Sequence, residues 1–205
     1  KKEIKFKTIN PGVLESNKGV HVTNRKITMN FLTKKDFKAI EIAKKNKIKD
    51  FALSFTNNLE DIIRFNKLLP NCNKIFKIET KSAIKNFKKM LKHGNKFLID
   101  RGDLSKDISI ENIPIAQRYI ISESKKISKK EVYIATNFLE SMTLNTEPTR
   151  AEVNDIYSSI EIGAAGLVLA AETAIGKNPA ECITFIKKIY FNFDKNQKKK
   201  LTASL

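Results

Sequence analysis

A lysine and a glutamate two residues apart, Lys77 and Glu79, interrupt an otherwise apolar stretch. Residues i and i+2 of a β-strand point to the same face, so the two charges would lie side by side. They form either a buried structural ion pair or a cation and a metal-binding carboxylate directed into one cavity. Asp103 supplies a second carboxylate after Gly102, whose missing Cβ allows close backbone approach. Two carboxylates from adjacent strand ends suit Mg²⁺, which leaves positions open for substrate phosphates.

Five short apolar segments with strand character would position these side chains. Each is rich in β-branched or aromatic residues and is apolar on both faces, as buried parallel strands are. The segments are 50–55, 74–79, 96–100, 131–136 and 165–171. Reacting groups of α/β barrels lie at the carboxyl ends of the strands. The polar residues found there, Thr136 among them, are therefore candidate site residues.

Segments with helical periodicity alternate with these strands, at 33–46, 59–69, 82–93, 113–127, 149–162 and 179–190. Thr33 and Thr149 each precede an acidic residue by three positions, the pattern of a capping box. Five strand–helix alternations predict an α/β fold with a parallel sheet and crossover helices. Residues 11–22 are typical of turns and a short β segment, and residues 193–205 of a polar, loosely ordered tail.

The composition argues against several classes of protein. The 205 residues include 39 Lys and Arg against 22 Asp and Glu, a formal net charge of +17. Basic residues are spread along the chain without interleaved aromatic residues, which favours a Lys-rich solvated surface, or attraction of a small anionic substrate, over nucleic-acid binding. Two cysteines, two histidines and the lack of a long apolar run argue against a disulfide framework, a zinc site and a membrane span.

Several separate stretches resemble the pyruvate kinase family. The most specific is ATNFLESM followed by PTRAEVNDI, within residues 135–156. The stretches ESNKGV, FALSF, KIET, RGDLS, IPIAQ and AETAIGKNPAE agree with the family in order. The resemblance implies a partial TIM (β/α)₈ barrel of about five βα units with a parallel sheet. Residues 1–32 resemble the connection from the family's lid domain to the barrel, and residues 33–192 resemble the barrel itself. Residues 193–205 are a polar basic tail.

The resemblance implies phosphoryl transfer from phosphoenolpyruvate to ADP, giving pyruvate and ATP in glycolysis. Lys77 resembles the lysine that stabilises the transferring group, and Thr136 the threonine that helps deliver a proton beside the substrate's methylene carbon. Glu79 and Asp103 resemble the carboxylates that bind Mg²⁺ or Mn²⁺. The backbone N–H groups of Gly102 and Asp103 resemble those that hold the substrate carboxylate. The family also uses K⁺, whose ligands are not in this chain.

The sequence departs from the family around these positions. Asp100 and Phe76 stand where small residues are usual, Asn137 replaces a glutamine, and Ala170 and Ala171 replace Ser-Gly. The family's lid and its phosphate-binding arginine belong to parts that are not matched. An open part-barrel leaves a sheet edge, which missing sequence or another chain must cover.

Two functions are therefore expected as alternatives. The first is a pyruvate kinase phosphotransferase, inactive as the isolated chain. The second is a non-catalytic, truncated relative with a structural or regulatory role. The resemblance also implies a homo-oligomer, a tetramer in the family, and a cytoplasmic location. The Lys- and Asn-rich composition is typical of an AT-rich genome and leaves an organelle such as a plastid as the alternative location.

Overall fold

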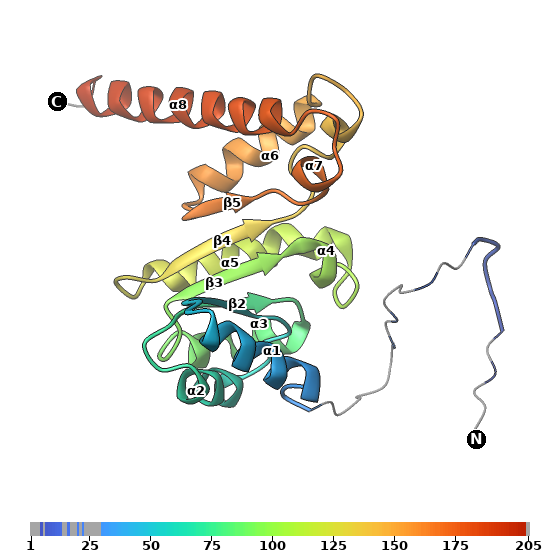
Figure 1. Cartoon of the computed structure of the whole chain (residues 1–205). Helices are drawn as coiled ribbons and strands as arrows, with labels where there is room; N and C mark the ends of the chain where they lie inside the picture. The colour runs from blue at the N-terminus through green and yellow to red at the C-terminus, as the bar shows by residue number, and fades with distance from the viewer. Residues whose placement is uncertain are drawn as a thin grey trace.

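A single parallel sheet organises the computed structural model, which describes residues 5, 7–13, 16, 20, 22 and 30–203. Its five strands lie in the order β1-β2-β3-β4-β5, the order of the sequence (Figure 1). They are β1 (Asp50–Leu53), β2 (Asn73–Ile78), β3 (Lys96–Asp100), β4 (Glu131–Ala135) and β5 (Gly166–Val168). The predicted α/β class is confirmed, and the strand order is that of one part of a (β/α)₈ barrel.

Helices follow the strands in alternation. They are α1 (Lys34–Lys45), α2 (Leu59–Leu68), α3 (Lys81–Met90), α4 (Arg101–Leu104), α5 (Ile113–Lys125), α6 (Arg150–Glu161), α7 (Ala171–Ala174) and α8 (Pro179–Ala203), with 3₁₀ turns at Ile110–Asn112 and Glu140–Thr143. The two predicted capping boxes begin α1 and α6, and a third, from Asn58 and Asp61, begins α2. These boxes satisfy backbone N–H groups that the first helical turn leaves without partners.

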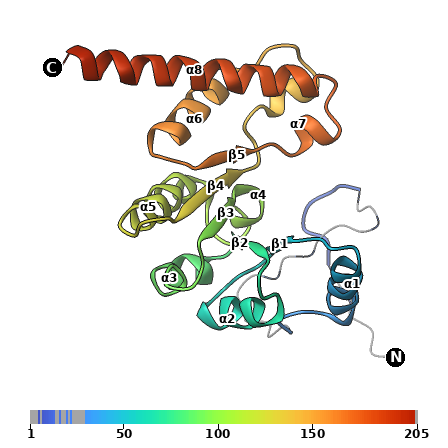
Figure 2. The ribbon, with the colours of Figure 1, turned by 60° about the vertical axis from the view of Figure 1, so that its left-hand side comes forward.

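One face of the sheet carries the hydrophobic core. Two rows of neighbouring side chains, each at most 2% exposed, run across the central strands: Phe76, Phe97 and Val132, and then Ile78, Ile99 and Ile134. Figure 2 shows α2, α3 and α5 following one another along one side of the strands. Parallel strands need such crossover helices, and the helices exclude water from this face.

The opposite face carries the polar residues. Lys77, Leu98 and Tyr133 are register partners on β2, β3 and β4. Lys77 and Tyr133 are only partly buried. Because side chains alternate along a strand, Glu79 and Asp100 lie on this same face, two residues beyond Lys77 and Leu98. The candidate site is therefore built where this face meets the carboxyl ends of the strands.

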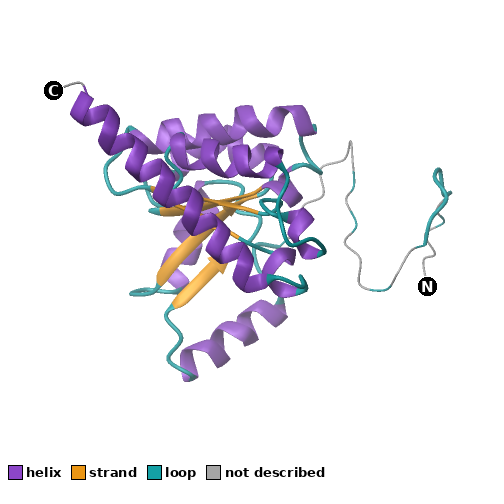
Figure 3. Ribbon diagram, turned by 90° about the horizontal axis from the view of Figure 1, so that it is seen from above, coloured by secondary structure: helices purple, strands orange, loops and turns teal. Residues whose placement is uncertain are grey.

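The C-terminal helix corrects one expectation. The tail predicted to be loosely ordered from residue 193 is helical to Ala203 in α8. Neither Gly nor Pro occurs after Pro179, and an Asp194–Lys198 ion pair of 2.6 Å stabilises successive turns. The ring of Phe193 packs edge-on against Tyr157 of α6, at 5.4 Å between centroids. Figures 1 and 3 show the C-terminal end of α8 projecting past the rest of the fold.

The predicted N-terminal β segment falls within residues 11–22, of which 14, 15, 17–19 and 21 lie outside the described residues. Those described there form no strand. At the other end of the sheet, β5 stops at Val168, and residue 171 of the predicted strand begins α7 instead. Among the described residues, no helix has both the length and the apolar character needed to cross a membrane.

Candidate active site

Lys77 holds two carboxylates at the carboxyl ends of β2 and β3. Its Nζ lies 2.7 Å from Oε1 of Glu79 and 2.9 Å from Oδ2 of Asp100. The i and i+2 spacing therefore does place Lys77 and Glu79 side by side. The second contact joins neighbouring strands, so the pair expected from sequence is a group of three charges.

Asp100 is a site residue that the sequence analysis did not select. The register of β2 and β3 pairs Ile78 with Ile99, which brings the following residues, Glu79 and Asp100, next to each other. Both then point to the polar face. The available signal was the position of Asp100 as the last residue of an apolar segment, but its use required the strand register.

Glu79 is nearly inaccessible to solvent, at 1% exposure. Its Oε2 accepts a hydrogen bond from the backbone N–H of Phe55, which follows β1. Phe55 has a φ of 52°, and this left-handed turn after β1 contributes the bonded N–H group. The other oxygen, Oε1, is buried and has the ion pair with Lys77 but no hydrogen bond of acceptable geometry. A buried carboxylate oxygen in this position suits a cation.

Asp103 adds a third carboxylate from α4. Oxygen atoms of Glu79, Asp100 and Asp103 lie within 4.8 Å of one another. Asp103 also accepts a hydrogen bond from Lys106, which lowers the pKa of its carboxyl group despite partial burial. Carboxylate oxygens are the donors that hard divalent cations prefer, so these three residues fit Mg²⁺ or Mn²⁺.

The Lys77 ammonium is charged in this environment. Burial acts to lower its pKa, but the close contacts of its ammonium with the carboxylates of Glu79 and Asp100, and the attraction of their charges, raise it above the ordinary value. Three carboxylates therefore face the ammonium groups of Lys77 and Lys106, and the group carries one excess negative charge.

Thr136 directly follows β4 and lies beside α4. Its Oγ1 accepts a 2.9 Å hydrogen bond from the backbone N–H of Gly102 and donates one of 2.6 Å to the carbonyl of Ala135. Thr136 and Asn137 have φ values of 74° and 56°. Two consecutive left-handed residues without glycine are unfavourable and require support from their surroundings.

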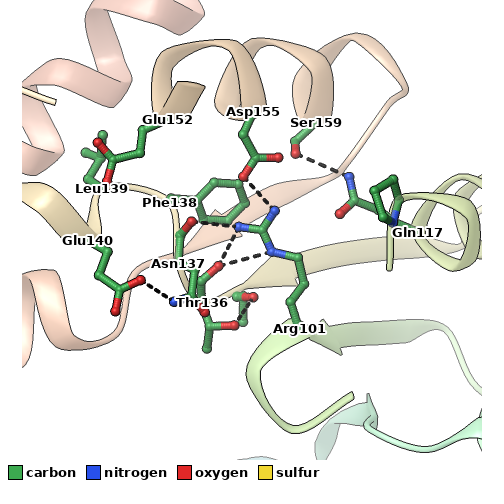
Figure 4. A network of polar contacts seen from close by, with 12 residues as sticks. Arg101, Gln117, Thr136, Asn137, Phe138, Leu139, Glu140, Glu152, Asp155 and Ser159 are labelled. Carbon is green, nitrogen blue, oxygen red and sulfur yellow. Dashed lines mark hydrogen bonds and ion pairs between the residues drawn. The ribbon is translucent and has the colours of Figure 1, made fainter. Parts of the chain in front are cut away.

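Arg101 supplies that support (Figure 4). Its guanidinium donates to the carbonyl oxygens of Thr136 and Asn137, and forms an ion pair of 2.6 Å with Asp155 of α6. It also lies over the ring of Phe138, 4.2 Å from the centroid. Sequence analysis missed Arg101 and Asp155, because their contact spans 54 residues of sequence and no local pattern marks it.

Glu172 fixes the same turn from the other side. This carboxylate of α7 is 1% exposed. One oxygen accepts from the N–H groups of Phe138 and Leu139, and the other from the N–H of Ala170 at 2.7 Å. A buried carboxylate thus connects the chain after β4 to the chain after β5. The sequence pattern gave no role to Glu172.

The two N–H groups expected to hold a substrate carboxylate have partners within the chain. That of Gly102 donates to Thr136, and that of Asp103 donates to Oδ1 of Asp100 at 3.3 Å. A Cβ at position 102 would lie 3.5 Å from Oγ1 of Thr136 and 3.6 Å from Oδ1 of Asp100. Gly102 therefore lies between Thr136 and the carboxylate group, and the structure brings all the expected residues to one edge of the sheet.

Comparison with known proteins adds independent information. The family described as "Pyruvate kinase, barrel domain" matches residues 1–183. The pyruvate kinase of Thermotoga maritima is 38% identical over 182 residues, covering 87% of this chain and 39% of that protein. The pyruvate kinase of Thermococcus litoralis is 34% identical over 191 residues, covering 91% and 40%. Plastidial pyruvate kinase 2 of Arabidopsis thaliana is 34% identical over 183 residues, covering 87% and 31%. The chain spans 31–40% of the length of these relatives.

Proposed function

The chain belongs to the pyruvate kinase family, and from that premise we propose that the whole protein transfers the phosphoryl group of phosphoenolpyruvate to ADP. What carries this proposal is the convergence of the Lys77 ammonium with the carboxylates of Glu79 and Asp103. Phosphoryl transfer depends mainly on positioning and charge stabilisation. An ammonium beside a group of cation-binding carboxylates supports both.

Lys77 stabilises the negative charge of the transferring phosphoryl group in this proposal. Its raised pKa keeps the ammonium protonated at neutral pH. Glu79 and Asp103 hold a divalent cation, Mg²⁺ or Mn²⁺, which when bound neutralises phosphate charge. Lys77 reaches the phosphoryl group by giving up part of its contact with the carboxylates that it now holds at 2.7 and 2.9 Å.

Thr136 takes part in the second half of the reaction. Loss of the phosphoryl group leaves the enolate of pyruvate, whose methylene carbon must gain one proton. The Thr136 hydroxyl passes its proton to that carbon and recovers one from solvent. Its hydrogen bond from the Gly102 N–H stabilises the oxygen as negative charge develops on it.

The substrate carboxylate is held by the N–H groups of Gly102 and Asp103 in this proposal. Both donate to acceptors inside the chain, Oγ1 of Thr136 and Oδ1 of Asp100. A bound carboxylate would replace these acceptors. The long 3.3 Å bond to Asp100 is the weaker of the two and is the one expected to yield first.

Pyruvate formation by the full-length protein tests the proposal. With phosphoenolpyruvate, ADP, Mg²⁺ and K⁺, a Lys77→Met variant should lose turnover. The matched control is Lys96→Met, which removes a partly exposed lysine on β3. Full activity in Lys77→Met would overturn the assignment of that residue, and no activity in the wild-type protein would overturn the proposed reaction.

One observation favours the alternative of a non-catalytic relative with a structural or regulatory role. Asp100 places a negative charge against Lys77 and accepts from the Asp103 N–H, two groups that a phosphorylated carboxylic acid would need. In this alternative Asp100 keeps the substrate out. Full-length protein would then bind no phosphoenolpyruvate in a calorimetric titration, and Asp100→Ala would restore binding. Turnover by the wild-type protein would refute this alternative.

The remaining expectations stay predictions. They are K⁺ as the second cation, a homo-oligomer or completion of the barrel by further sequence or another chain, and a cytoplasmic location with a plastid as the alternative. The division of the chain at residues 32 and 192 is likewise a proposal. Nucleic acid is not proposed as a partner, because the basic residues are dispersed along the chain.

A further inference from the structure

We propose that Asp100 is a third carboxylate ligand of the divalent cation site formed with Glu79 and Asp103. We further propose that the cation replaces the Lys77 ammonium on the carboxylates of Glu79 and Asp100. The inference rests on the cation site of the proposed function and deepens it, because it assigns a ligand at a position where the resemblance predicts a small residue. Oxygen atoms of all three carboxylates lie within 4.8 Å of one another.

Glu79 supplies the observation that points to a ligand. It is 1% exposed, and its Oε1 has no hydrogen bond of acceptable geometry. The Lys77 ammonium lies 2.7 Å from this oxygen and is a monovalent partner for it. Burying a carboxylate is costly unless a positive charge compensates it, so the same oxygen attracts a divalent cation more strongly.

Asp100 is held in position for this role. One of its oxygens, Oδ1, accepts from the Asp103 N–H and so caps α4. The other, Oδ2, lies 2.9 Å from Nζ of Lys77. The cap and the contact with Lys77 orient the side chain, so Oδ2 lies beside the ammonium that also contacts Glu79 before any cation binds. A ligand already oriented loses little conformational entropy on binding.

The charges require Lys77 and the cation to exchange. Three carboxylates face two ammonium groups, those of Lys77 and Lys106. A divalent cation among the carboxylates would be repelled by a Lys77 ammonium that remained in contact with both Glu79 and Asp100. Cation binding therefore releases Lys77 from these partners and frees its ammonium for an anionic ligand.

Mn²⁺ titration of the full-length protein without substrate tests the inference, with free Mn²⁺ followed by electron paramagnetic resonance. Asp100→Asn should raise the Kd at least about tenfold, since even a residue that only supports a metal ligand changes affinity by about this factor. Water-proton relaxation should show about one more water on the bound Mn²⁺ in Asp100→Ala. The control Asp50→Asn removes a carboxylate at the amino end of β1, away from the carboxyl ends of the strands that carry the site, and should leave the Kd unchanged.

Lys77→Met tests the exchange. Loss of a competing ammonium should lower the Kd for Mn²⁺, whereas a purely structural lysine would leave it unchanged or raise it. Thermal unfolding with and without Mn²⁺ confirms that each variant is folded. Should Asp100→Asn not fold, Asp100→Ala serves in both measurements.

The outcomes separate this inference from the proposed function. An unchanged Kd in the Asp100 variants, with binding lost in Glu79→Gln and Asp103→Asn, would overturn the role of Asp100 and leave the cation site in place. Unchanged binding in all of these variants would overturn both. No decrease in Kd for Lys77→Met would overturn the exchange.

Discussion

The backbone N–H of Gly102 donates a hydrogen bond of 2.9 Å to Oγ1 of Thr136. This bond joins the residues that follow β3 to those that follow β4. The threonine therefore takes its orientation from a main-chain atom of the neighbouring unit, which a substitution at position 102 leaves in place. The same glycine lies close to Asp100, so the hydroxyl and the carboxylate group are adjacent.

Replacing Thr136 by valine tests whether its hydroxyl delivers the proton. Valine keeps the shape but has no hydroxyl, and general acid–base groups contribute about 10²–10⁴-fold to rate. We expect a loss of pyruvate formation in this range for the full-length protein, with Thr136→Ser retaining most activity. Activity of Thr136→Val within twofold of wild type would show that the hydroxyl carries no proton.

Arg101 should contribute strongly to stability. Its side chain is 11% exposed and holds the carbonyl groups of two left-handed residues together with Asp155. Arg101→Met leaves these groups without a donor, so we expect a loss of about 3 kcal/mol in the free energy of unfolding by urea. Arg101→Lys should be nearly as destabilising as Arg101→Met, because an ammonium lacks the planar fork of N–H groups that reaches all three acceptors.

The control for Arg101 is Arg118→Met on the exposed side of α5. This substitution should change the free energy of unfolding by no more than about 0.5 kcal/mol, as most surface substitutions do. An equal effect of the two variants would contradict the role assigned to Arg101.

Local patterns explain how much of this fold the sequence reveals. Alternation placed Lys77 and Glu79 on one face, and the helix starts at Thr33 and Thr149 followed from capping boxes that involve only four residues each. The end of α8 was misjudged because polar composition was taken as a sign of a loose tail. The i,i+4 pair and the packing of Phe193 on α6 favour helix there.

The rest of the site depends on tertiary placement. Asp100 joins Glu79 only through the register of two strands, and Arg101 meets Asp155 across 54 residues. Glu172 binds N–H groups more than 30 positions away. Such contacts leave no periodic or local signal, because each is fixed by the packing of separate strand–helix units rather than by neighbours in sequence.

Glu172 should be needed to hold the turn after β4. Its two oxygens accept from three N–H groups, those of Phe138, Leu139 and Ala170. Glu172→Ala leaves these donors, two of them in buried hydrogen bonds, without acceptors, and we expect a loss of about 3 kcal/mol or more in the free energy of unfolding. Glu172→Gln keeps one acceptor oxygen, so its free energy of unfolding should fall by less.

Hydrogen exchange gives a local reading of the same change. The amides of Phe138 and Leu139 should exchange faster in Glu172→Ala, while those of β2 keep their protection. Equal exchange at Phe138 in variant and wild type would show that the carboxylate does not fix the turn.

Acid should weaken the fold through Asp103. The hydrogen bond from Lys106 lowers the pKa of this carboxyl group below its unfolded value of about 3.9. A lowered folded-state pKa contributes stability that is fully present above the unfolded pKa and is lost as pH falls through the folded one. In Lys106→Met the folded-state pKa of Asp103 should rise toward the unfolded value, so the loss of stability still begins near the unfolded pKa but ends at a higher pH and is smaller. Carboxyl-carbon NMR titration of Asp103, with urea unfolding between about pH 2 and 6, measures the pKa and the stability.

The control is Lys85→Met, which removes an exposed lysine of α3 and should leave the Asp103 titration unchanged. An unchanged Asp103 titration in Lys106→Met would show that the ion pair between Lys106 and Asp103 does not form in solution.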